Sequence, residues 1–377
     1  MPQTVLPVKP YFPSEDIEEA KATLQEILSS GMLTLGKHNA EFEKEFSRLC
    51  KVDHAVAVNS GTSALEISLR CIGLKEGDEV LLPTNTFAAT AAAVIFAGGR
   101  PVLTDIDPES LCLSPEVIRD KISDKIRGII AVHIGGLVCP DILEIKDICK
   151  NRKLFLIEDA AHAAGSMIGH APAGSIGDTG CFSFYPTKVI TTAEGGMMTT
   201  NDGRIAAKAK IMRDQGKESF SSSSHVALGN NWRLSEISAA LGVLQLKRLG
   251  EIIDRRNGIA RLYDKAFKSM DGTRPILVSL NSRSNYYKYT VILPDGVNRD
   301  GLKQKLRADG VICGSEVYWP PLHLQPYYQE LLGTKLGDFP VAEDVCSRMI
   351  CPPLNSQMTN EDASFVTDRF AANLGTV

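Results

Sequence analysis

Short apolar segments alternate with helix-like segments over roughly the first 250 residues, and this alternation restricts the folds open to the chain. The apolar segments are rich in aliphatic and β-branched residues, whereas the segments between them repeat apolar side chains at helical spacing. The predicted strands are His54–Val58, Glu79–Pro83, Pro101–Ile106, Gly128–His133 and Leu154–Ile157. Since parallel strands need a crossover connection, usually a helix, the pattern predicts an α/β domain with a wound, mainly parallel sheet.

The helices of this pattern can be placed from their caps and apolar faces. Ser14 is a candidate cap for a first helix, in which Ile17, Ala20, Leu24 and Ile27 share one face. Further helices are predicted from Phe42 to Leu49, from Pro115 onward, from Ser235 to Leu249, from Glu251 to Phe267 and from Arg299 to Ala308.

The pattern changes after Asp159. Two short runs, Cys181–Tyr185 and Gly196–Thr200, are predicted to be adjacent strands on either side of a loop that carries Lys188. The polar residues from Gln215 to Asn231 predict an exposed loop of unusual length, and loops of this kind often have a function.

Strand and helix patterns are mixed beyond about residue 270, which indicates a second domain. This part includes a strand-like run at Tyr287–Leu293. We expect a large α/β domain over residues 1–250 and a smaller C-terminal α+β domain over residues 251–377. The N-terminal helix is the segment of the large domain that could pack with the small one.

Composition excludes several classes of protein. The net charge of −4, with acidic and basic residues interspersed, gives no basic stripe for nucleic acid. The nine cysteines are an odd number without a C-x-x-C pair, so we expect reduced thiols and neither a disulfide framework nor a metal site. The longest apolar stretch, Phe87–Gly99, is too short to span a membrane, and the N-terminus does not resemble a secretory signal. We expect a cytoplasmic protein that acts on small molecules.

Two segments, Leu154–His162 and Thr179–Lys188, together predict a pyridoxal phosphate site. Asp159, at the end of an apolar strand, could keep a pyridine nitrogen protonated, and Lys188, from a nearby loop, could carry the cofactor as a Schiff base. Taken alone, each residue has a simpler explanation. A loop lysine is usually solvated, and an aspartate after a strand often caps a helix or belongs to a turn.

A third segment supports an anion site. The apolar run His54–Val58 ends before Gly61, and a helical pattern that includes Leu65 follows. A glycine between strand and helix allows close approach of a ligand, and the first N–H groups of the helix point toward it. The alternative is a plain turn capped by Ser60 or Thr62. Both this turn and Asp159 follow strands, where wound sheets bind ligands.

In order along the chain, these motifs resemble those of the DegT/StrS-type sugar aminotransferases, which belong to the fold type I class of pyridoxal phosphate enzymes. The matching segments are Gly31–Gly36, Ser60–Leu65, Pro83–Ala88, Glu158–Ala163, Phe182–Lys188, Glu194–Gly196, Gly229–Arg233 and Pro320–Pro326. They cover nearly the whole chain. Two residues depart from the family pattern: Trp232 stands where the family often has tyrosine, and Asn230 stands where an aromatic residue is common.

The resemblance implies catalytic roles for three residues. Lys188 would hold the cofactor and then carry the proton between cofactor and substrate carbons. Asp159 would pair with the ring nitrogen, and His162 would lie near the phenolic oxygen of the ring. Phe87 would stack on the ring face. Without the resemblance, His162 and Phe87 would more simply be core residues.

The resemblance also implies how the phosphate and the substrate are bound. Gly61, Thr62 and Ser63, with the Ser183 hydroxyl, would hold the phosphate. Asn231 would reach it from a neighbouring subunit, which predicts a homodimer with shared active sites. For Asn231 the alternative is a turn residue. The substrate contacts implied are Tyr318 and His323, and for His323 a structural hydrogen bond is the alternative.

The predicted reaction is transfer of an amino group, with L-glutamate as donor, to a keto group of a nucleotide-linked keto-deoxysugar. A ketocyclitol aminotransferase is a related possibility. Ketosugar dehydratases of the same family have histidine in place of the lysine, so Lys188 favours amination. A non-enzymatic regulator is the alternative from another class. The sugar, its keto position and its nucleotide depend on loops near 31–38, 215–231 and 315–326, whose shape the sequence does not give.

One motif argues for a different function and is rejected. The segment Gly31–Lys37 matches a nucleoside triphosphate phosphate loop up to its lysine. His38 follows where Ser or Thr should bind magnesium, and a helical pattern precedes it where a strand is required. The sequence also lacks the G-x-S-x-G elbow of hydrolases and the G-x-G-x-x-G turn of dinucleotide-binding folds.

Overall fold

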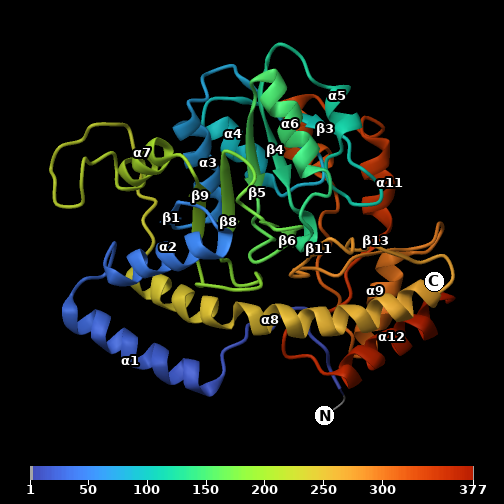
Figure 1. Ribbon diagram of the computed structural model, residues 1–377. Helices are drawn as coiled ribbons and strands as arrows, with labels where there is room; N and C mark the ends of the chain where they lie inside the picture. The colour runs from blue at the N-terminus through green and yellow to red at the C-terminus, as the bar shows by residue number, and fades with distance from the viewer. Residues whose placement is uncertain (1–2, 377) are drawn as a thin grey trace.

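The computed structural model describes residues 3–376, and a seven-stranded sheet forms its centre (Figure 1). In the order β1-β9-β8-β5-β4-β2-β3, the strands are β1 (His54–Val58), β9 (Gly196–Thr200), β8 (Thr179–Ser183), β5 (Phe155–Asp159), β4 (Ile126–Val132), β2 (Glu79–Pro83) and β3 (Arg100–Thr104). β9 runs antiparallel to both of its neighbours, and every other pair is parallel. The predicted mainly parallel sheet of an α/β fold is therefore confirmed.

The ends of the strands depend on pairing as well as on apolar character. Strands β1, β2 and β9 have the predicted ends, whereas β3, β4, β5 and β8 are shifted by one or two residues. Strand β5 shows the reason, because Glu158 pairs with Ala131 and Asp159 pairs with Val132. Because of this pairing, β5 includes two carboxylate residues, whereas the apolar pattern alone would end the strand at Ile157.

Helices cover both faces of the sheet (Figure 1). In this part of the chain they are α1 (Ser14–Ser30), α2 (Lys37–Cys50), α3 (Gly61–Ile72), α4 (Ala88–Phe96), α5 (Pro115–Arg119), α6 (Ile142–Arg152) and α7 (Gly203–Arg213). Successive side chains of a strand point to opposite faces. On β8, Cys181 contacts Ser68 of α3, whereas the ring of Phe182 lies 4.8 Å from that of Phe46 in α2. Helices α2 and α3 therefore lie on opposite faces.

The N-terminus of α2 is already occupied by a carboxylate of the same chain. The side chain of Glu236 accepts hydrogen bonds from the backbone N–H groups of Gly36 at 2.8 Å, His38 at 2.8 Å and Asn39 at 3.0 Å. These are the donors that a phosphate would need at a helix start. The structure thus gives a second reason to reject a nucleotide phosphate loop at residues 31–37.

Helix α8 is a single helix, Glu236–Ser269, where the sequence predicted two. The predicted break at Gly250 was wrong. A glycine within a helix costs only about 1 kcal/mol, and buried apolar side chains continue on both sides of it, including Leu249 and Ile252. Figure 1 shows α8 extending below the sheet toward the C-terminal part of the chain. Because α8 crosses residue 250, the division into domains 1–250 and 251–377 stays a prediction.

Helix α1 lies beside α8 and is only loosely attached to it (Figure 1). Ser14 begins the helix and does not cap it, because Pro13 holds the cap position without a side-chain hydrogen bond. Arg248 of α8 pairs with the buried Asp16 at 2.7 Å. On the predicted apolar face only Ile27 is buried, and Ile17 and Leu24 are 43% and 39% exposed. The described chain therefore leaves most of this apolar face uncovered.

The C-terminal part is mixed α and β, as predicted. It contains the helices α9 (Arg299–Ala308), α10 (Pro326–Leu332), α11 (Pro340–Arg348) and α12 (Asn360–Leu374), and the short strands β10 (Arg274–Pro275), β12 (Val291–Ile292) and β13 (Met349–Ile350). Strand β11 (Ser282–Arg283) pairs with β6 (Met167–Ile168), which also pairs with β7 (Ala171–Pro172). The strand predicted at Tyr287–Leu293 is limited to β12. The backbone of Tyr287 and Lys288 instead forms hydrogen bonds with Arg256 and Gly135.

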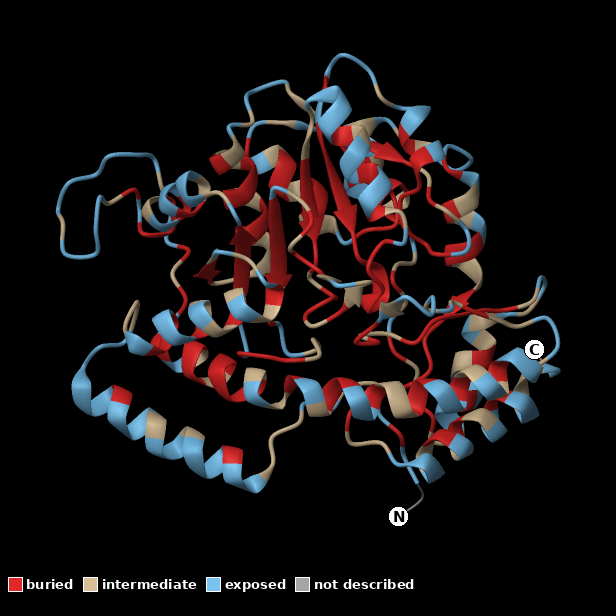
Figure 2. Cartoon of the chain, viewed as in Figure 1, coloured by how far each residue is buried: buried red, intermediate tan, exposed pale blue. Residues whose placement is uncertain are grey.

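The loop from Gln215 to Asn231 extends away from the body of the molecule and is mostly exposed (Figure 2). The predicted long loop is therefore confirmed. All nine cysteines are free thiols, as expected from the sequence, and all except Cys313 are buried. No helix within residues 3–376 combines the length and the hydropathy needed to cross a membrane.

Candidate active site

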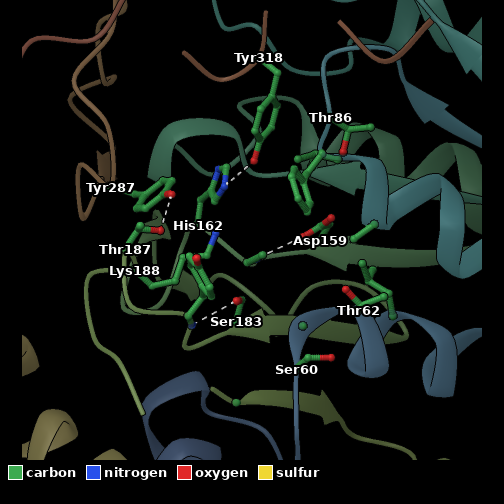
Figure 3. Close-up of a pocket in the computed structure, with 18 of the residues that line it drawn as sticks. Ser60, Thr62, Thr86, Asp159, His162, Ser183, Thr187, Lys188, Tyr287 and Tyr318 are labelled. Atoms are coloured by element: carbon green, nitrogen blue, oxygen red, sulfur yellow. Dashed lines mark hydrogen bonds between the residues drawn. The ribbon is translucent and has the colours of Figure 1, made fainter. Parts of the chain in front are cut away.

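A cavity of about 490 Å³ lies at the carboxyl ends of the sheet strands and brings most of the predicted residues together (Figure 3). Of the predicted site residues, its lining includes Gly61, Thr62, Phe87, Asp159, His162, Ser183, Lys188 and Tyr318. The volume is in the range of small-molecule sites. Ser63, Asn231 and His323 are not part of the lining.

Asp159 ends strand β5 and is buried in the cavity wall. Its Oδ2 accepts a hydrogen bond from the Thr90 hydroxyl at 2.8 Å, and its Oδ1 accepts one from the Ala161 N–H at 3.2 Å. Burial raises the pKa of Asp159, although these hydrogen bonds and the charge of Lys188 lower it. A cationic group bound beside it would hold this carboxyl in its ionised form.

The neighbouring residue, Glu158, is also buried but points away from the cavity lining. It accepts hydrogen bonds from the N–H groups of Gly174, Ile176 and Gly177 at 2.6–2.8 Å and lies 2.9 Å from His133 Nε2. Burial acts to raise its pKa, but these hydrogen bonds outweigh it and lower the pKa of Glu158. Because Glu158 and Asp159 alternate across the strand, this network fixes the end of β5 and with it the position of Asp159.

Lys188 is held in a desolvated position above an aromatic ring. Its Nζ lies 4.6 Å from the centroid of the Tyr287 ring. Burial lowers the pKa of Lys188 from 10.5 to about 8; the charge of Lys288 also lowers it, whereas that of Asp159 raises it. A substantial fraction of this amine is therefore neutral near pH 8, as a nucleophilic amine must be.

His162 is buried between two tyrosines. Its ring stacks on Tyr287, with centroids 4.3 Å apart, and its Nε2 lies 2.9 Å from the Tyr318 hydroxyl. Its Nδ1 accepts a hydrogen bond from the Gly135 N–H at 3.3 Å. Burial, together with the charges of Lys188 and Lys288, holds the pKa of His162 well below its usual value. The ring is therefore neutral and carries its proton on Nε2, from which it donates to Tyr318.

The start of helix α3 combines a cap with open N–H groups. Ser60 is the cap, and its Oγ accepts a hydrogen bond from the Ser63 N–H at 3.0 Å. This is the capped turn that the sequence allowed as an alternative. The bond uses the N–H of Ser63 and leaves those of Gly61 and Thr62 at the cavity. Ser63 itself is buried and donates its hydroxyl to Asn59 Oδ1 at 2.7 Å.

Gly61 is needed because β8 passes close to it. A Cβ built on Gly61 would lie 2.9 Å from the Cβ of Ser183. Ser183 ends β8, and its Oγ accepts a weak hydrogen bond from the Tyr185 N–H at 3.4 Å. The absence of a side chain at Gly61 thus brings the Ser183 hydroxyl and the helix start to the same end of the cavity, which Figure 3 shows near Ser60 and Thr62.

Two further predicted residues lie at the surface of this chain. Phe87 precedes α4, lines the cavity and is 59% exposed, so it is not the core residue that its Ala-rich context suggested. Asn231 lies outside the cavity, and its side chain is exposed. Its backbone carbonyl accepts a hydrogen bond from the Asn59 side chain at 3.2 Å. Asn231 is therefore placed next to the α3 turn but does not enter its own cavity.

His323 does not reach the cavity. It is completely buried, with Nδ1 at 2.7 Å from the Thr84 hydroxyl and Nε2 at 2.9 Å from a Glu343 oxygen. Both ring nitrogens are thus used in linking β2 to α11. This geometry favours the structural hydrogen bond that was the alternative for His323, and we give this residue no substrate contact.

Several lining residues were not identified from the sequence. They include Thr86, Tyr185, Thr187, Glu194, Tyr287, Lys288 and Ser315. Tyr287 and Lys288 were assigned to a strand, and Thr90, which supports Asp159, was hidden in an Ala-rich helix. A polar residue in an apolar helix was the one available signal for Thr90. Nothing in the local pattern marked Tyr287.

Comparisons with known proteins agree with this geometry over nearly the whole chain. Residues 14–371 match the model of the DegT/DnrJ/EryC1/StrS aminotransferase family. The chain is 34% identical over 372 residues to the spore coat polysaccharide biosynthesis protein SpsC of Bacillus subtilis, covering 95% of this chain and 94% of that one. It is also 34% identical over 354 residues to GDP-perosamine synthase of Caulobacter vibrioides, covering 93% and 94%.

A solved structure shows the same fold. Helicobacter pylori PseC, an aminotransferase involved in the biosynthesis of pseudoaminic acid, superimposes with a TM-score of 0.92 at 26% identity over the full length of both chains. The expected fold type I architecture is thereby confirmed. The chain belongs to the DegT/DnrJ/EryC1/StrS aminotransferase family.

Proposed function

We propose that this protein is a pyridoxal phosphate-dependent aminotransferase that moves an amino group from L-glutamate to a keto group of a nucleotide-linked keto-deoxysugar. The observation that carries the proposal is the content of one cavity: the buried Asp159, Lys188 with its pKa lowered to about 8, and the open start of α3. The substrate class is supported by similarity to a relative named GDP-perosamine synthase.

The residues present fit each part of the cofactor. Asp159 suits a protonated ring nitrogen, the amine of Lys188 suits an aldehyde, and the N–H groups of Gly61 and Thr62 with the Ser183 hydroxyl suit a phosphate. Ser63 acts only indirectly on the phosphate site, because its N–H group donates to the Ser60 side chain that caps α3. Phe87, exposed at the cavity wall, is free to stack on a ring face. When bound, pyridoxal phosphate supplies a conjugated cationic ring that accepts the electron pair left by removal of a proton beside nitrogen.

Each catalytic residue has a defined task in this proposal. The amine of Lys188 would hold the cofactor covalently and, when free, would act as the general base and acid that moves a proton at the reacting carbons. Asp159 would hold the ring nitrogen in its protonated form. His162 is neutral and holds its Nε2 proton toward Tyr318, so it orients the Tyr318 hydroxyl at the substrate side of the cavity.

The active form in this proposal is a homodimer in which Asn231 serves the site of the partner subunit. Three features support it: the exposed position of Asn231, the 59% exposed Phe87 at the cavity wall, and the uncovered apolar face of α1. A loop residue near Asn231, Leu228, is 84% exposed. A reducing compartment, the cytoplasm, fits the nine free thiols.

Hybrid dimers test the shared site. Lys188→Ala and Asn231→Ala variants are each inactive or weak, but a mixed dimer should contain one site that carries neither change. After unfolding and joint refolding, about a quarter of the wild-type activity should return. No recovery in a mixture shown by mass to contain hybrids would rule out a contribution of Asn231 across the interface.

The reaction is tested with purified protein, L-glutamate and a panel of nucleotide-linked ketosugars, with the products followed by mass spectrometry. An aminated sugar with matching release of 2-oxoglutarate is the expected result. Ketocyclitols in the same panel distinguish the related aminotransferase, and loss of oxygen without gain of nitrogen would indicate a dehydratase. A protein that binds the cofactor but converts none of these compounds would contradict the proposed function and favour a regulatory role.

A further inference from the structure

Lys288 is a cation in the cavity that lacks an anionic partner. It lines the same cavity as Lys188, and within residues 3–376 its ammonium group forms no ion pair and no hydrogen bond. The charge of Glu316 acts to raise the pKa of Lys288, but Glu316 forms its ion pair with Lys303, at 2.6 Å. The ammonium of Lys288 is therefore available to a ligand.

The position of Lys288 is electrostatically unfavourable without an anion. Its Nζ lies 5.4 Å from the centroid of the Tyr287 ring, and the Nζ of Lys188 lies 4.6 Å from the same centroid. Burial lowers the pKa of Lys288, and its charge lowers the pKa of Lys188 and His162. Two desolvated cations in one cavity repel each other, and an anionic group bound between or beside them removes that cost.

The backbone that carries Lys288 is held rigidly. Its N–H donates to the Gly135 carbonyl at 2.9 Å. Just before it, the guanidinium of Arg256 on α8 donates to the carbonyls of Asn285 at 3.0 Å and Tyr287 at 3.1 Å. A charged group on a fixed backbone loses less conformational freedom when it binds a ligand. The backbone of Lys288 is thus held in place before a ligand binds.

This cation belongs to the end of the cavity away from α3. Figure 3 shows Tyr287 and Tyr318 on the side opposite to Ser60 and Thr62. The proposed function places the cofactor phosphate at Gly61 and Thr62, so that phosphate is not the partner of Lys288. The remaining anions of the reaction are the carboxylates of the amino donor and the diphosphate of the nucleotide sugar.

We propose that Lys288 binds an oxyanion of the substrate, carboxylate or diphosphate, and thereby determines which anionic substrates the site accepts. This inference rests on the proposed function and names a specificity residue within it. It assigns Lys288 to substrate binding and leaves cofactor attachment to Lys188.

The test is calorimetric binding of two unreactive probes to the cofactor-loaded protein. Glutarate represents the dicarboxylate of the donor, and a set of nucleoside diphosphates represents the nucleotide end. In Lys288→Met, the Kd of one probe class should rise about 10- to 100-fold, as expected for a lost charge-assisted hydrogen bond, and the affected probe identifies the source of the oxyanion. The visible absorbance of the cofactor should not change.

A second variant moves the charge without removing it. A Cβ built on Gly314 would lie 2.7 Å from the Nζ of Lys288, the flexible end of that side chain, so Gly314→Ala should displace the ammonium and leave the backbone intact. It should weaken the same probe as Lys288→Met, by a smaller factor. Lys265→Met, which removes an exposed lysine of α8, is the matched control and should leave both Kd values unchanged.

The outcomes separate this inference from the proposed function. Wild-type Kd values for both probes in Lys288→Met, or equal losses in Lys265→Met, would overturn the role of Lys288 even if the enzyme aminates a ketosugar. Failure of both probes to bind the wild-type protein would also overturn it. If Lys288→Met does not fold, unchanged binding by Gly314→Ala has the same consequence. A selective loss of one probe supports the role even if no ketosugar in the panel is aminated.

Discussion

The two ends of the cavity are built in different ways. The end that contains Asp159 and the start of α3 is made of strand ends and a helix start, which belong to the wound sheet itself. The end that contains Tyr287 and Tyr318 is made of irregular backbone held by side chains from elsewhere. The Tyr318 N–H donates to Asn85 Oδ1 at 2.6 Å, and the Arg256 guanidinium donates to the Tyr287 carbonyl at 3.1 Å.

In the proposed function, the first end binds the cofactor and is called the cofactor end, and the second end binds the substrate and is called the substrate end. A fold in which ligands collect at the strand ends offers the same positions to any cofactor-binding relative. The substrate end depends on individual tertiary contacts, so single substitutions can change it without altering the sheet. We therefore expect variants at the first end to lose catalysis and variants at the second end to lose substrate binding.

The largest effect is expected for Lys188→Ala, at the cofactor end. Without the amine there is no covalent attachment and no proton carrier, so kcat should fall by more than about 1,000-fold. Borohydride reduction and peptide mapping of the wild-type protein should label Lys188. A label on another lysine, or near-normal turnover of the variant, would show that the cofactor end is assigned incorrectly.

Asp159→Asn should lower kcat by about 100-fold, because a neutral amide no longer favours the protonated ring nitrogen. Substrate KM and cofactor loading should change much less, since the Thr90 hydroxyl can still donate to the amide oxygen. Steady-state kinetics and the visible absorbance band measure the two effects separately. A large rise in KM with unchanged kcat would mean that Asp159 binds substrate, and the contrast between the two ends would fail.

Arg256→Met should affect the substrate end and spare the cofactor end. The variant leaves buried carbonyls of residues 285–287 without donors, which should lower the free energy of unfolding by about 2 kcal/mol. Substrate KM should rise about 10-fold as Tyr287 and Lys288 shift, a change of about 1.4 kcal/mol. Arg261→Met, at an exposed position on the same helix, is the control. Loss of cofactor absorbance in Arg256→Met alone would show that the two ends are not separable.

The smallest effect is expected in the pH dependence of cofactor uptake. It measures how strongly the charge of Lys288, at the substrate end, changes the pKa of Lys188. Lys188 has a pKa of about 8, so the rate at which cofactor-free protein takes up pyridoxal phosphate should rise as pH increases through 8 and then level off. The charge of Lys288 lowers the pKa of Lys188, so Lys288→Met should raise that pKa and move the profile to higher pH. Stopped-flow absorbance measures the rates. A shift to lower pH would contradict the stated electrostatics.

The sequence predicted which residues meet at the first of these ends, because its signals are local there. The strand–turn–helix at His54–Leu65 and the strand that ends at Asp159 each lie within about a dozen residues, and the structure brings them together with Lys188. The prediction was less accurate where long-range contacts decide. The two ring nitrogens of His323 form hydrogen bonds with Thr84 and Glu343. Helix α8 continues through Gly250 because buried side chains pack on both sides of it.

By itself, the amino-acid sequence determined the wound sheet, the family and the pair Asp159 and Lys188, because periodicity and short motifs encode elements and their ends. Only the tertiary structure decided how the substrate end is formed. Tyr287, Lys288 and Tyr318 come from segments whose backbone is fixed by distant partners such as Arg256 and Asn85. Hydrogen bonds between residues far apart in the chain leave no periodic signature, so their consequences appear only when the chain is folded.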